Sequence, residues 1–316
     1  MSSTATRIFV TGSSGFVGSH LLAQLLAESR RYQAAILRRP GSNPWRIAPL
    51  LKHVETIVGD LTEPTSIDQQ LRKFAPQVVV HLGWQGVTGR RYDDTTQLDN
   101  INNSINLLRM SAAAGASVWI GLGSQAEYGP CHGTIAEDTP CHAMTLYGAA
   151  KLSVCQVARH FCAVHDMRFA WLRLFSCYGP GDHADRMIPN LITNLLAGRC
   201  PPLTAGEQRW DYMHVEDAAA AIRNVIFQSI AEGVFNLGSG ATRTIRKICE
   251  YIRDLINPSL PLVFGEVPYQ TNQVMHLQAD IRRLAEVTEW APQIPLDEGL
   301  RQTVQWYRDK GALFAA

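Results

Sequence analysis

The glycine-rich segment Thr11-Gly12-Ser13-Ser14-Gly15-Phe16-Val17-Gly18 constrains the fold of this chain more than any other feature. It follows a short β-prone stretch, residues 8–10, and precedes apolar residues at helical spacing, residues 17–26. Glycines in the pattern G-x-x-G-x-x-G let the backbone turn tightly and approach a pyrophosphate, while helix N-terminal N–H groups face its charge. Because this turn joins a strand to a helix, it predicts a dinucleotide site. The residues expected to contact the dinucleotide are Gly12, Ser14, Gly15, Phe16, Val17 and Gly18.

Strands and helices continue to alternate through the first half of the chain. Strand patterns cover residues 34–37, 54–58, 77–82 and 118–122, and helical patterns cover residues 100–114 and 147–164. The near-continuous apolar runs at 77–82 and 118–122 are typical of strands buried on both faces. The alternation predicts an α/β fold with a doubly wound parallel (Rossmann) sheet.

Beyond Phe175 the alternation of strands and helices changes. The elements are shorter, and prolines interrupt them from there through the C-terminal third. This mixture is typical of a smaller α+β lobe. The predicted dinucleotide-binding domain comprises residues 1–175 together with about 213–245. The predicted smaller lobe comprises residues 176–212 and 246–316.

Composition excludes several classes of protein. Of the 316 residues, 46% are hydrophobic and 18% charged, and 29 basic against 28 acidic side chains leave a net charge of +1. This balance offers no general field for nucleic acid or a membrane surface. The polar residues 1–6 and the absence of an apolar run of about 20 residues predict a cytoplasmic protein. The seven dispersed cysteines are expected to be reduced thiols.

The end of the second strand carries Arg38-Arg39. In dinucleotide-binding folds an acid at this place reads a free ribose 2′-hydroxyl, whereas a base reads a 2′-phosphate. Two guanidinium groups can grip a phosphate by forked hydrogen bonds, so the pair favours NADP(H) over NAD(H). After the third strand, Asp60 and Leu61 are expected beside the adenine ring.

Tyr147 and Lys151 are four residues apart at the start of a predicted helix. Residues at this spacing share a helix face, so the Lys151 ammonium could lower the pKa of the Tyr147 phenol and hold a cofactor ribose. Such a tyrosine can exchange a proton with a carbonyl or alcohol while hydride moves to or from nicotinamide. Ser124 follows a buried strand, at the edge of the sheet where ligands bind, and its hydroxyl could contact the same oxygen.

Two Cys-His pairs, Cys131-His132 and Cys141-His142, could in principle supply four zinc ligands. Adjacent residues rarely both reach one metal, so we expect no metal site.

With these motifs in the order seen here, the chain resembles the extended short-chain dehydrogenase/reductases, also called NAD-dependent epimerase/dehydratases. The resemblance covers residues 7–308 and implies a catalytic triad of Ser124, Tyr147 and Lys151, supported by Asn100. It also implies that the smaller lobe, residues 176–212 and 246–316, is a substrate-binding lobe for a nucleoside diphosphate sugar. It further implies a homodimer formed through the helices near 100 and 150. The segments that carry it are 11–18, Gly59-Asp60-Leu61, His81-Leu82-Gly83, 124–129, 147–151, Arg173-Leu174-Phe175, 178–180, 211–217 and 236–240. From these segments Leu82, Gly83, Trp84 and Phe175 are expected to join the cofactor site.

Residues after Ser124 distinguish branches of this family. Members that eliminate water typically have Asp and Glu at the next two positions, whereas this chain has Gln125 and Ala126, which disfavours a 4,6-dehydratase. The arginine pair favours an NADPH-dependent reductase of a nucleotide-linked 4-keto-(6-deoxy) sugar. A nucleotide-sugar 4-epimerase with retained NAD(P) and a reductase of a non-sugar ketone remain alternatives. The role of Glu127 is unexplained.

The chain also departs from the family pattern. Trp210 stands where epimerases typically have the arginine that contacts the diphosphate, and Ser176 replaces the usual Asn. Trp84 and Gln85 replace smaller residues and either line the sugar pocket or, for Trp84, serve packing. The predicted substrate-binding residues are Trp84, Gln85, Gln125, Ser176, Arg186, Arg209, Asp211 and Arg282.

Overall fold

The computed structural model describes residues 5–29, 31–87, 91–270 and 273–310. In this part of the chain seven parallel strands form one sheet, in the order β11-β7-β5-β4-β1-β2-β3. The strand order reverses at β1, where Ile8 pairs with Ala34 of β2 on one side and Val78 of β4 on the other. The strands are β1 (Thr6–Thr11), β2 (Tyr32–Arg38), β3 (Glu55–Val58), β4 (Val78–His81), β5 (Val118–Ser124), β7 (Arg168–Leu174) and β11 (Gly233–Leu237).

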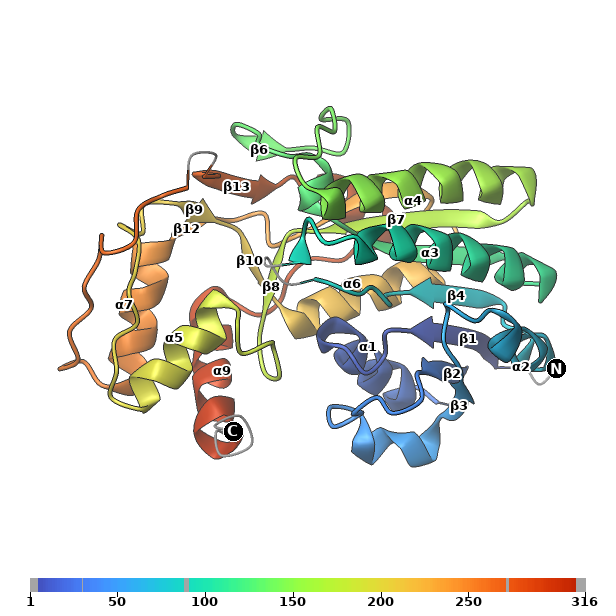
Figure 1. The fold of residues 1–316 in the computed structure, drawn as a ribbon, viewed down its shortest axis with the longest axis horizontal. Helices are drawn as coiled ribbons and strands as arrows, with labels where there is room; N and C mark the ends of the chain where they lie inside the picture. The colour runs from blue at the N-terminus through green and yellow to red at the C-terminus, as the bar shows by residue number, and fades with distance from the viewer. Residues whose placement is uncertain (1–4, 30, 88–90, 271–272, 311–316) are drawn as a thin grey trace.

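Helices cover both faces of this sheet (Figure 1). One face packs against α1 (Phe16–Ala27) and α6 (Val215–Phe227), and the other against α2 (Thr65–Phe74), α3 (Thr96–Ala113) and α4 (Leu146–Val164). Each interface is a separate apolar core, because every central strand presents side chains to both faces. The predicted doubly wound α/β fold is confirmed.

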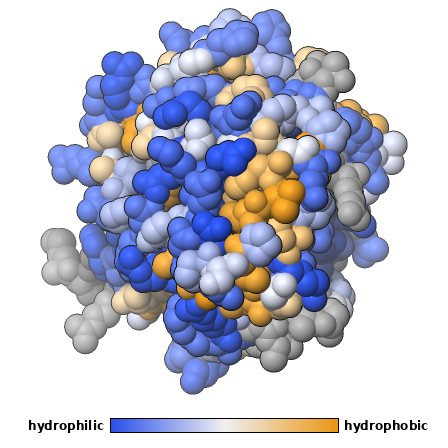
Figure 2. All heavy atoms as spheres, turned by 90° about the vertical axis from the view of Figure 1, so that its left-hand side faces the viewer, coloured by the Kyte–Doolittle hydropathy of each residue, from blue (hydrophilic) through white to orange (hydrophobic). Residues whose placement is uncertain are grey.

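A second group of elements forms the left side of Figure 1. Its core lies between α5 (Met187–Leu196), α7 (Ile245–Ile256) and α9 (Leu296–Lys310). A small sheet has the order β12-β9-β13-β6, and β8 pairs with β10 in parallel. These strands are β6 (Thr134–Ile135), β8 (Ser176–Tyr178), β9 (Arg209–Trp210), β10 (Tyr212–His214), β12 (Arg243–Thr244) and β13 (His276–Ala279). The face that this group presents in Figure 2 is mostly hydrophilic, with one gathering of apolar side chains.

Two segments depart from the predicted domain boundaries. Strand β6 lies in the first half of the chain, yet it pairs with β13 of the second group. Helix α8 (Arg282–Thr288) lies in the C-terminal third, yet its Leu284 and the following Trp290 pack into the core of the main sheet beside α6. Both segments are short, and contacts with elements distant in the sequence decide which core they join. The division into two domains otherwise stays a prediction.

In the described residues, no helix combines the length and the apolar character that a membrane span needs. Residues 1–4, which belong to the polar segment used for the cytoplasmic prediction, lie outside the described part of the chain. All seven cysteines carry free thiols, and Cys155, Cys162 and Cys249 are buried.

Candidate active site

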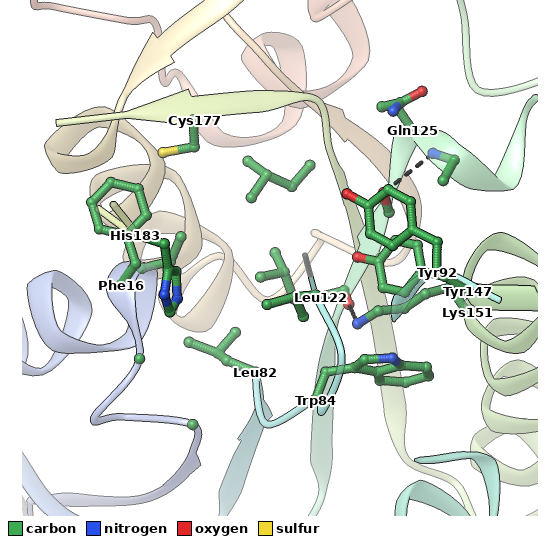
Figure 3. A pocket seen from close by; sticks show the side chains of 18 of the residues that line it. Phe16, Leu82, Trp84, Tyr92, Leu122, Gln125, Tyr147, Lys151, Cys177 and His183 are labelled. Atoms are coloured by element: carbon green, nitrogen blue, oxygen red, sulfur yellow. Dashed lines mark hydrogen bonds between the residues drawn. The ribbon is translucent and has the colours of Figure 1, made fainter. Parts of the chain in front are cut away.

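The carboxyl ends of the central strands open into a cavity of about 1020 Å³. Its walls come from the turns after β1 and β4, the ends of β5 and β7, and residues of β8, β9 and the start of α5. Open α/β sheets bind ligands at this edge, where the strand order reverses. Figure 3 shows side chains from both groups of elements around the cavity.

Most residues predicted from the sequence line this cavity. They are Gly12, Ser14, Gly15, Phe16, Val17, Gly18, Arg39, Asp60, Leu61, Leu82, Gly83, Trp84, Gln85, Asn100, Ser124, Gln125, Tyr147, Lys151, Phe175, Ser176 and Arg186. Arg38, Arg209, Asp211 and Arg282 do not form part of the wall. The position of the first set is established; the roles assigned to these residues stay predictions.

The glycine turn cannot accept side chains at two positions. Gly12 has φ +72°, and a Cβ there would lie 2.6 Å from the backbone N of Gly83. A Cβ on Gly18 would lie 2.2 Å from the carbonyl oxygen of Gly12. Gly15 is the N-cap of α1 and provides no side-chain cap, so the first N–H groups of the helix have no capping side chain as a partner. These features fit the pyrophosphate of a dinucleotide.

Arg39 and Ser42 lie at the end of the cavity formed by the turn after β2. Arg39 is exposed, and its carbonyl oxygen accepts a 2.7 Å hydrogen bond from the Ser42 hydroxyl. Arg38 lies off the wall, and its buried Nε has no hydrogen-bond partner. The predicted phosphate-reading pair therefore contributes one arginine to the cavity, because neighbouring residues at a strand end point to opposite faces of the sheet.

Ser124, Tyr147 and Lys151 all line the cavity and come from two elements. Figure 3 shows Tyr147 and Lys151 side by side in its wall. Ser124 is the last residue of β5, whereas Tyr147 lies in the first turn of α4 and Lys151 one turn further. All three side chains are buried. The Ser124 hydroxyl accepts a 3.2 Å hydrogen bond from the backbone N–H of Ala126, and its interaction with the Tyr147 phenol works to lower the pKa of Tyr147. The arrangement can hold a substrate oxygen between a hydroxyl and a phenol.

Burial shifts the pKa values of this pair in opposite directions. It raises the pKa of Tyr147, contrary to the expectation that Lys151 would lower it. It lowers the pKa of Lys151 to about 7, although the Glu127 carboxylate works against this shift. The expectation failed because helical spacing says nothing about desolvation, which disfavours the charged form of both groups.

Trp84 lies directly beside Lys151. The ammonium nitrogen lies 3.7 Å from the centre of the indole ring and donates a 2.6 Å hydrogen bond to the Leu122 carbonyl. The indole N–H donates to the side-chain oxygen of buried Gln97 at 2.8 Å. Trp84 therefore belongs to the cavity wall and is more than a packing residue.

Asn100 of α3 holds the chain that follows Trp84. Its amide oxygen accepts from the backbone N–H of Gln85 at 2.9 Å, and its amide nitrogen donates to the Gln85 carbonyl, also at 2.9 Å. The predicted supporting residue thus fixes a loop of the cavity wall from a neighbouring helix.

Glu127, unexplained from the sequence, is fully buried behind Ser124. One carboxylate oxygen accepts from the Ser124 backbone N–H at 2.9 Å and from the Trp171 indole at 2.9 Å. The other forms a 2.8 Å ion pair with buried Arg173. Its partners on β7 are 44 and 46 residues away in the chain, so no local pattern could have revealed this network.

Two further features of the wall have no sequence signal. Tyr92, in an irregular loop, stacks on Tyr147 with ring centres 4.8 Å apart (Figure 3). Burial works to lower the pKa of Arg186, but the Tyr92 phenol and a hydrogen bond to it raise this pKa overall.

Asp182 and His183 also line the cavity, and burial raises the pKa of Asp182 to about 7.

The family model described as "NAD dependent epimerase/dehydratase family" matches residues 8–238 of this chain. The chain belongs to this family. The resemblance stated from its motifs is confirmed, and the protein is an enzyme of the extended short-chain dehydrogenase/reductase type that uses a nicotinamide cofactor.

Relatives of the epimerase/dehydratase family match nearly the whole chain. GDP-6-deoxy-D-mannose reductase of Pseudomonas aeruginosa is 27% identical, covering 93% of this chain and 95% of the relative. dTDP-glucose 4,6-dehydratase of Streptomyces niveus is 24% identical, with coverages of 97% and 94%. UDP-glucose 4-epimerase of Thermotoga maritima, solved with UDP-glucose, superposes with a TM-score of 0.87 at 22% identity, covering 96% of this chain and 99% of that structure.

In the present chain, three residues that were expected to bind substrate do not line the cavity. Asp211 is fully buried and accepts hydrogen bonds from the backbone N–H groups of residues 239, 240 and 279, so it ties loops together. Exposed Arg209 donates to the Thr242 hydroxyl at 3.2 Å. Arg282 projects into solvent and pairs with Asp280.

The two departures from the family pattern contact each other. The indole N–H of Trp210 donates a 2.6 Å hydrogen bond to the Ser176 hydroxyl, and both residues line the cavity. The second group of elements therefore presents an indole ring at the place where the family pattern would put a guanidinium group.

Proposed function

We propose that the protein is an NADPH-dependent reductase of a nucleotide-linked 4-keto-(6-deoxy) sugar. The observation that carries this proposal is that Arg39 and Ser42 share a cavity with Ser124, Tyr147 and Lys151. A cationic strand end with a neighbouring hydroxyl favours a 2′-phosphate over a free hydroxyl. NADPH is the usual donor for a reduction in which the cofactor is exchanged after each turnover.

The cofactor would lie along the glycine turn, with its pyrophosphate at the N-terminus of α1 and its adenosine between Arg39 and Asp60. When bound, it supplies the hydride for the reduction. Lys151 is the cation that would hold the nicotinamide ribose, because it is buried in the cavity wall beside Tyr147.

Tyr147 would donate the proton that the reduced carbonyl oxygen needs. Burial raises its pKa, so the phenol keeps its proton at neutral pH, as a general acid must. Ser124 would hold the same oxygen through its hydroxyl, because it lines the same cavity as Tyr147. The protonated phenol is the form that a reduction needs, because the proton passes to the carbonyl oxygen.

Arg186 would contact the substrate diphosphate. It lines the cavity at the start of α5, whereas Arg209 and Arg282 do not reach the cavity. Gln85, Gln125 and the Trp210–Ser176 pair would surround the sugar. The similarity to GDP-6-deoxy-D-mannose reductase supports a reductase, and Gln125-Ala126 after the catalytic hydroxyl argues against the dehydratase relatives.

The test is a panel of UDP-, dTDP-, GDP- and CDP-linked 4-keto sugars, with consumption of NADPH followed by absorbance. We expect turnover with one nucleotide and formation of the corresponding alcohol. Interconversion of two sugars without net consumption of NADPH would identify an epimerase. Turnover of simple ketones with no nucleotide sugar accepted would identify a reductase of another class.

A titration of both cofactors tests the cofactor preference separately. NADPH should bind more tightly than NADH, and Arg39→Ala should weaken NADPH alone by about 10–100-fold, as for a hydrogen bond to a charged group. Arg109→Ala removes an exposed arginine of α3 and should leave both affinities unchanged. Tighter binding of NADH to the unaltered protein would overturn the NADP assignment.

A further inference from the structure

Lys151 is a buried cation without an ionic partner in the described residues. Its nitrogen has one hydrogen bond, to the Leu122 carbonyl at 2.6 Å. The acid that acts on it, Glu127, has its carboxylate engaged by Arg173, Trp171 and the Ser124 backbone. A carbonyl alone is weak compensation for burying an ammonium group. The remaining contact is the face of Trp84, 3.7 Å from the nitrogen.

Two contacts determine the orientation of the Trp84 ring. Its N–H donates to the Gln97 side-chain oxygen, and fully buried Gln97 in turn donates to the carbonyls of Gly86 and Arg91. The ring meets Tyr147 edge-on, with an interplanar angle of 89°. One face of the indole is thereby presented to Lys151, as Figure 3 shows.

A tryptophan face attracts a cation more strongly than the faces of other aromatic side chains, and the attraction grows when water is excluded. We propose that Trp84 is the positioning residue of Lys151, holding its ammonium group by a cation–π contact beside Tyr147. This inference rests on the proposed function in one respect, because Lys151 acts as a cation in both.

The titratable groups around Lys151 are Glu127, His81 and Tyr147. Glu127 raises the pKa of Lys151. His81 is buried, and burial together with the Lys151 charge lowers its pKa to about 3, so it is neutral. The Tyr147 phenol keeps its proton at neutral pH. Loss of the indole face should therefore lower the pKa of Lys151 from about 7.

The experiment is a pH titration by NMR of the protein labelled with ¹³C at lysine, in the absence of cofactor and substrate. Only five lysines occur in the chain, so the Lys151 side chain can be assigned by comparison with Lys151→Met. The variants are Trp84→Phe and Trp84→Leu. Both lose the hydrogen bond to Gln97, so the difference between them isolates the aromatic face. Trp290→Phe is the control, because buried Trp290 lies off the cavity and its N–H has no partner.

In the unaltered protein, the signals of the Lys151 ε-methylene should be shifted upfield by the ring current of the indole. Trp84→Leu should abolish this shift and lower the pKa of Lys151 by about one unit, while Trp84→Phe retains more than half of both effects. Trp290→Phe should change neither. An unchanged pKa in Trp84→Leu would overturn the proposal. A raised pKa would also overturn it, because Trp84 would then only exclude water.

A second measurement follows catalysis. With an accepted substrate, the alkaline limb of kcat/KM should move to lower pH in Trp84→Leu and return toward its original position in Trp84→Phe. A uniform loss of rate without movement of the limb would indicate a merely structural role. Because the NMR measurement needs no substrate, failure of the proposed reaction and failure of this inference are distinguishable.

Discussion

Tyr147 and Lys151 are four residues apart and both buried, which gives each a pKa that favours its uncharged form. The phenol is thus a proton donor throughout the neutral range, whereas the ammonium group loses its charge near neutrality. At the scale of single residues, the catalytic behaviour of the site depends on burial as much as on the identity of the side chains.

Replacing Tyr147 with Phe removes the phenol oxygen and little else. Turnover should fall at least about 100-fold, as for loss of a general acid, while affinity for the cofactor stays within about twofold. Steady-state kinetics and a fluorescence titration measure the two effects. Near-normal turnover in this variant would contradict the role of Tyr147 as proton donor.

The pKa of Lys151, lowered to about 7 by burial, predicts the pH dependence of the free enzyme. Lys151 is charged below this pH and neutral above it, so kcat/KM should decrease as the pH rises through about 7. In Lys151→Arg the charge persists, because arginine does not deprotonate in this range, and this limb should disappear. A limb that persists in Lys151→Arg would have to come from another group, such as Asp182, whose pKa is also about 7.

At the scale of elements, the 3-10 helix Gln125–Glu127 follows strand β5. Hydrogen bonds of its Glu127 side chain link β5 to the neighbouring strand β7. Glu127 closes a capping box with Ser124 and reaches Trp171 and Arg173 of β7. The backbone of Ser124 is therefore held, through Glu127, by the neighbouring strand as well as by its own.

Glu127→Gln would leave the buried Arg173 without its counter-ion. The free energy of unfolding should fall by about 3–5 kcal/mol, as measured for other broken buried ion pairs. Glu28→Gln is the matched control, since Glu28 pairs with Arg31 and Arg223 at the surface and should cost less than about 1 kcal/mol. Urea denaturation measures both values, and equal small losses would contradict the importance of the network.

At the scale of the whole molecule, the paired helices α3 and α4 form one outer face. Val157 and Val164 of α4 are exposed there and, with Phe161, form a shallow apolar groove. Apolar patches on helices of this kind often mark protein interfaces.

The homodimer predicted through these helices should therefore depend on the Val157 side of α4. Val157→Arg should convert the dimer to a monomer, because it places a charge in the apolar groove. Exposed Ile230, which lies outside both helices, provides the control Ile230→Arg. Analytical ultracentrifugation distinguishes the two states. A monomeric unaltered protein at micromolar concentration would rule out the interface.

Local sequence patterns alone determined the glycine turn, the order of strands and helices, and the Tyr147–Lys151 pair, because each depends on residues within one or two turns of chain. Even there, burial reversed the expected shift in the pKa of Tyr147.

The tertiary structure alone decided which side chains meet across elements. It brought Trp84 beneath Lys151 and Tyr92 over Tyr147, and it connected Glu127 to the neighbouring strand. It also separated Arg209 and Arg282 from the cavity, although both were expected to bind the substrate. The reason is physical: spacing along the chain defines neighbours on one helix or strand, whereas contacts between elements depend on the register of the sheet and on helix packing.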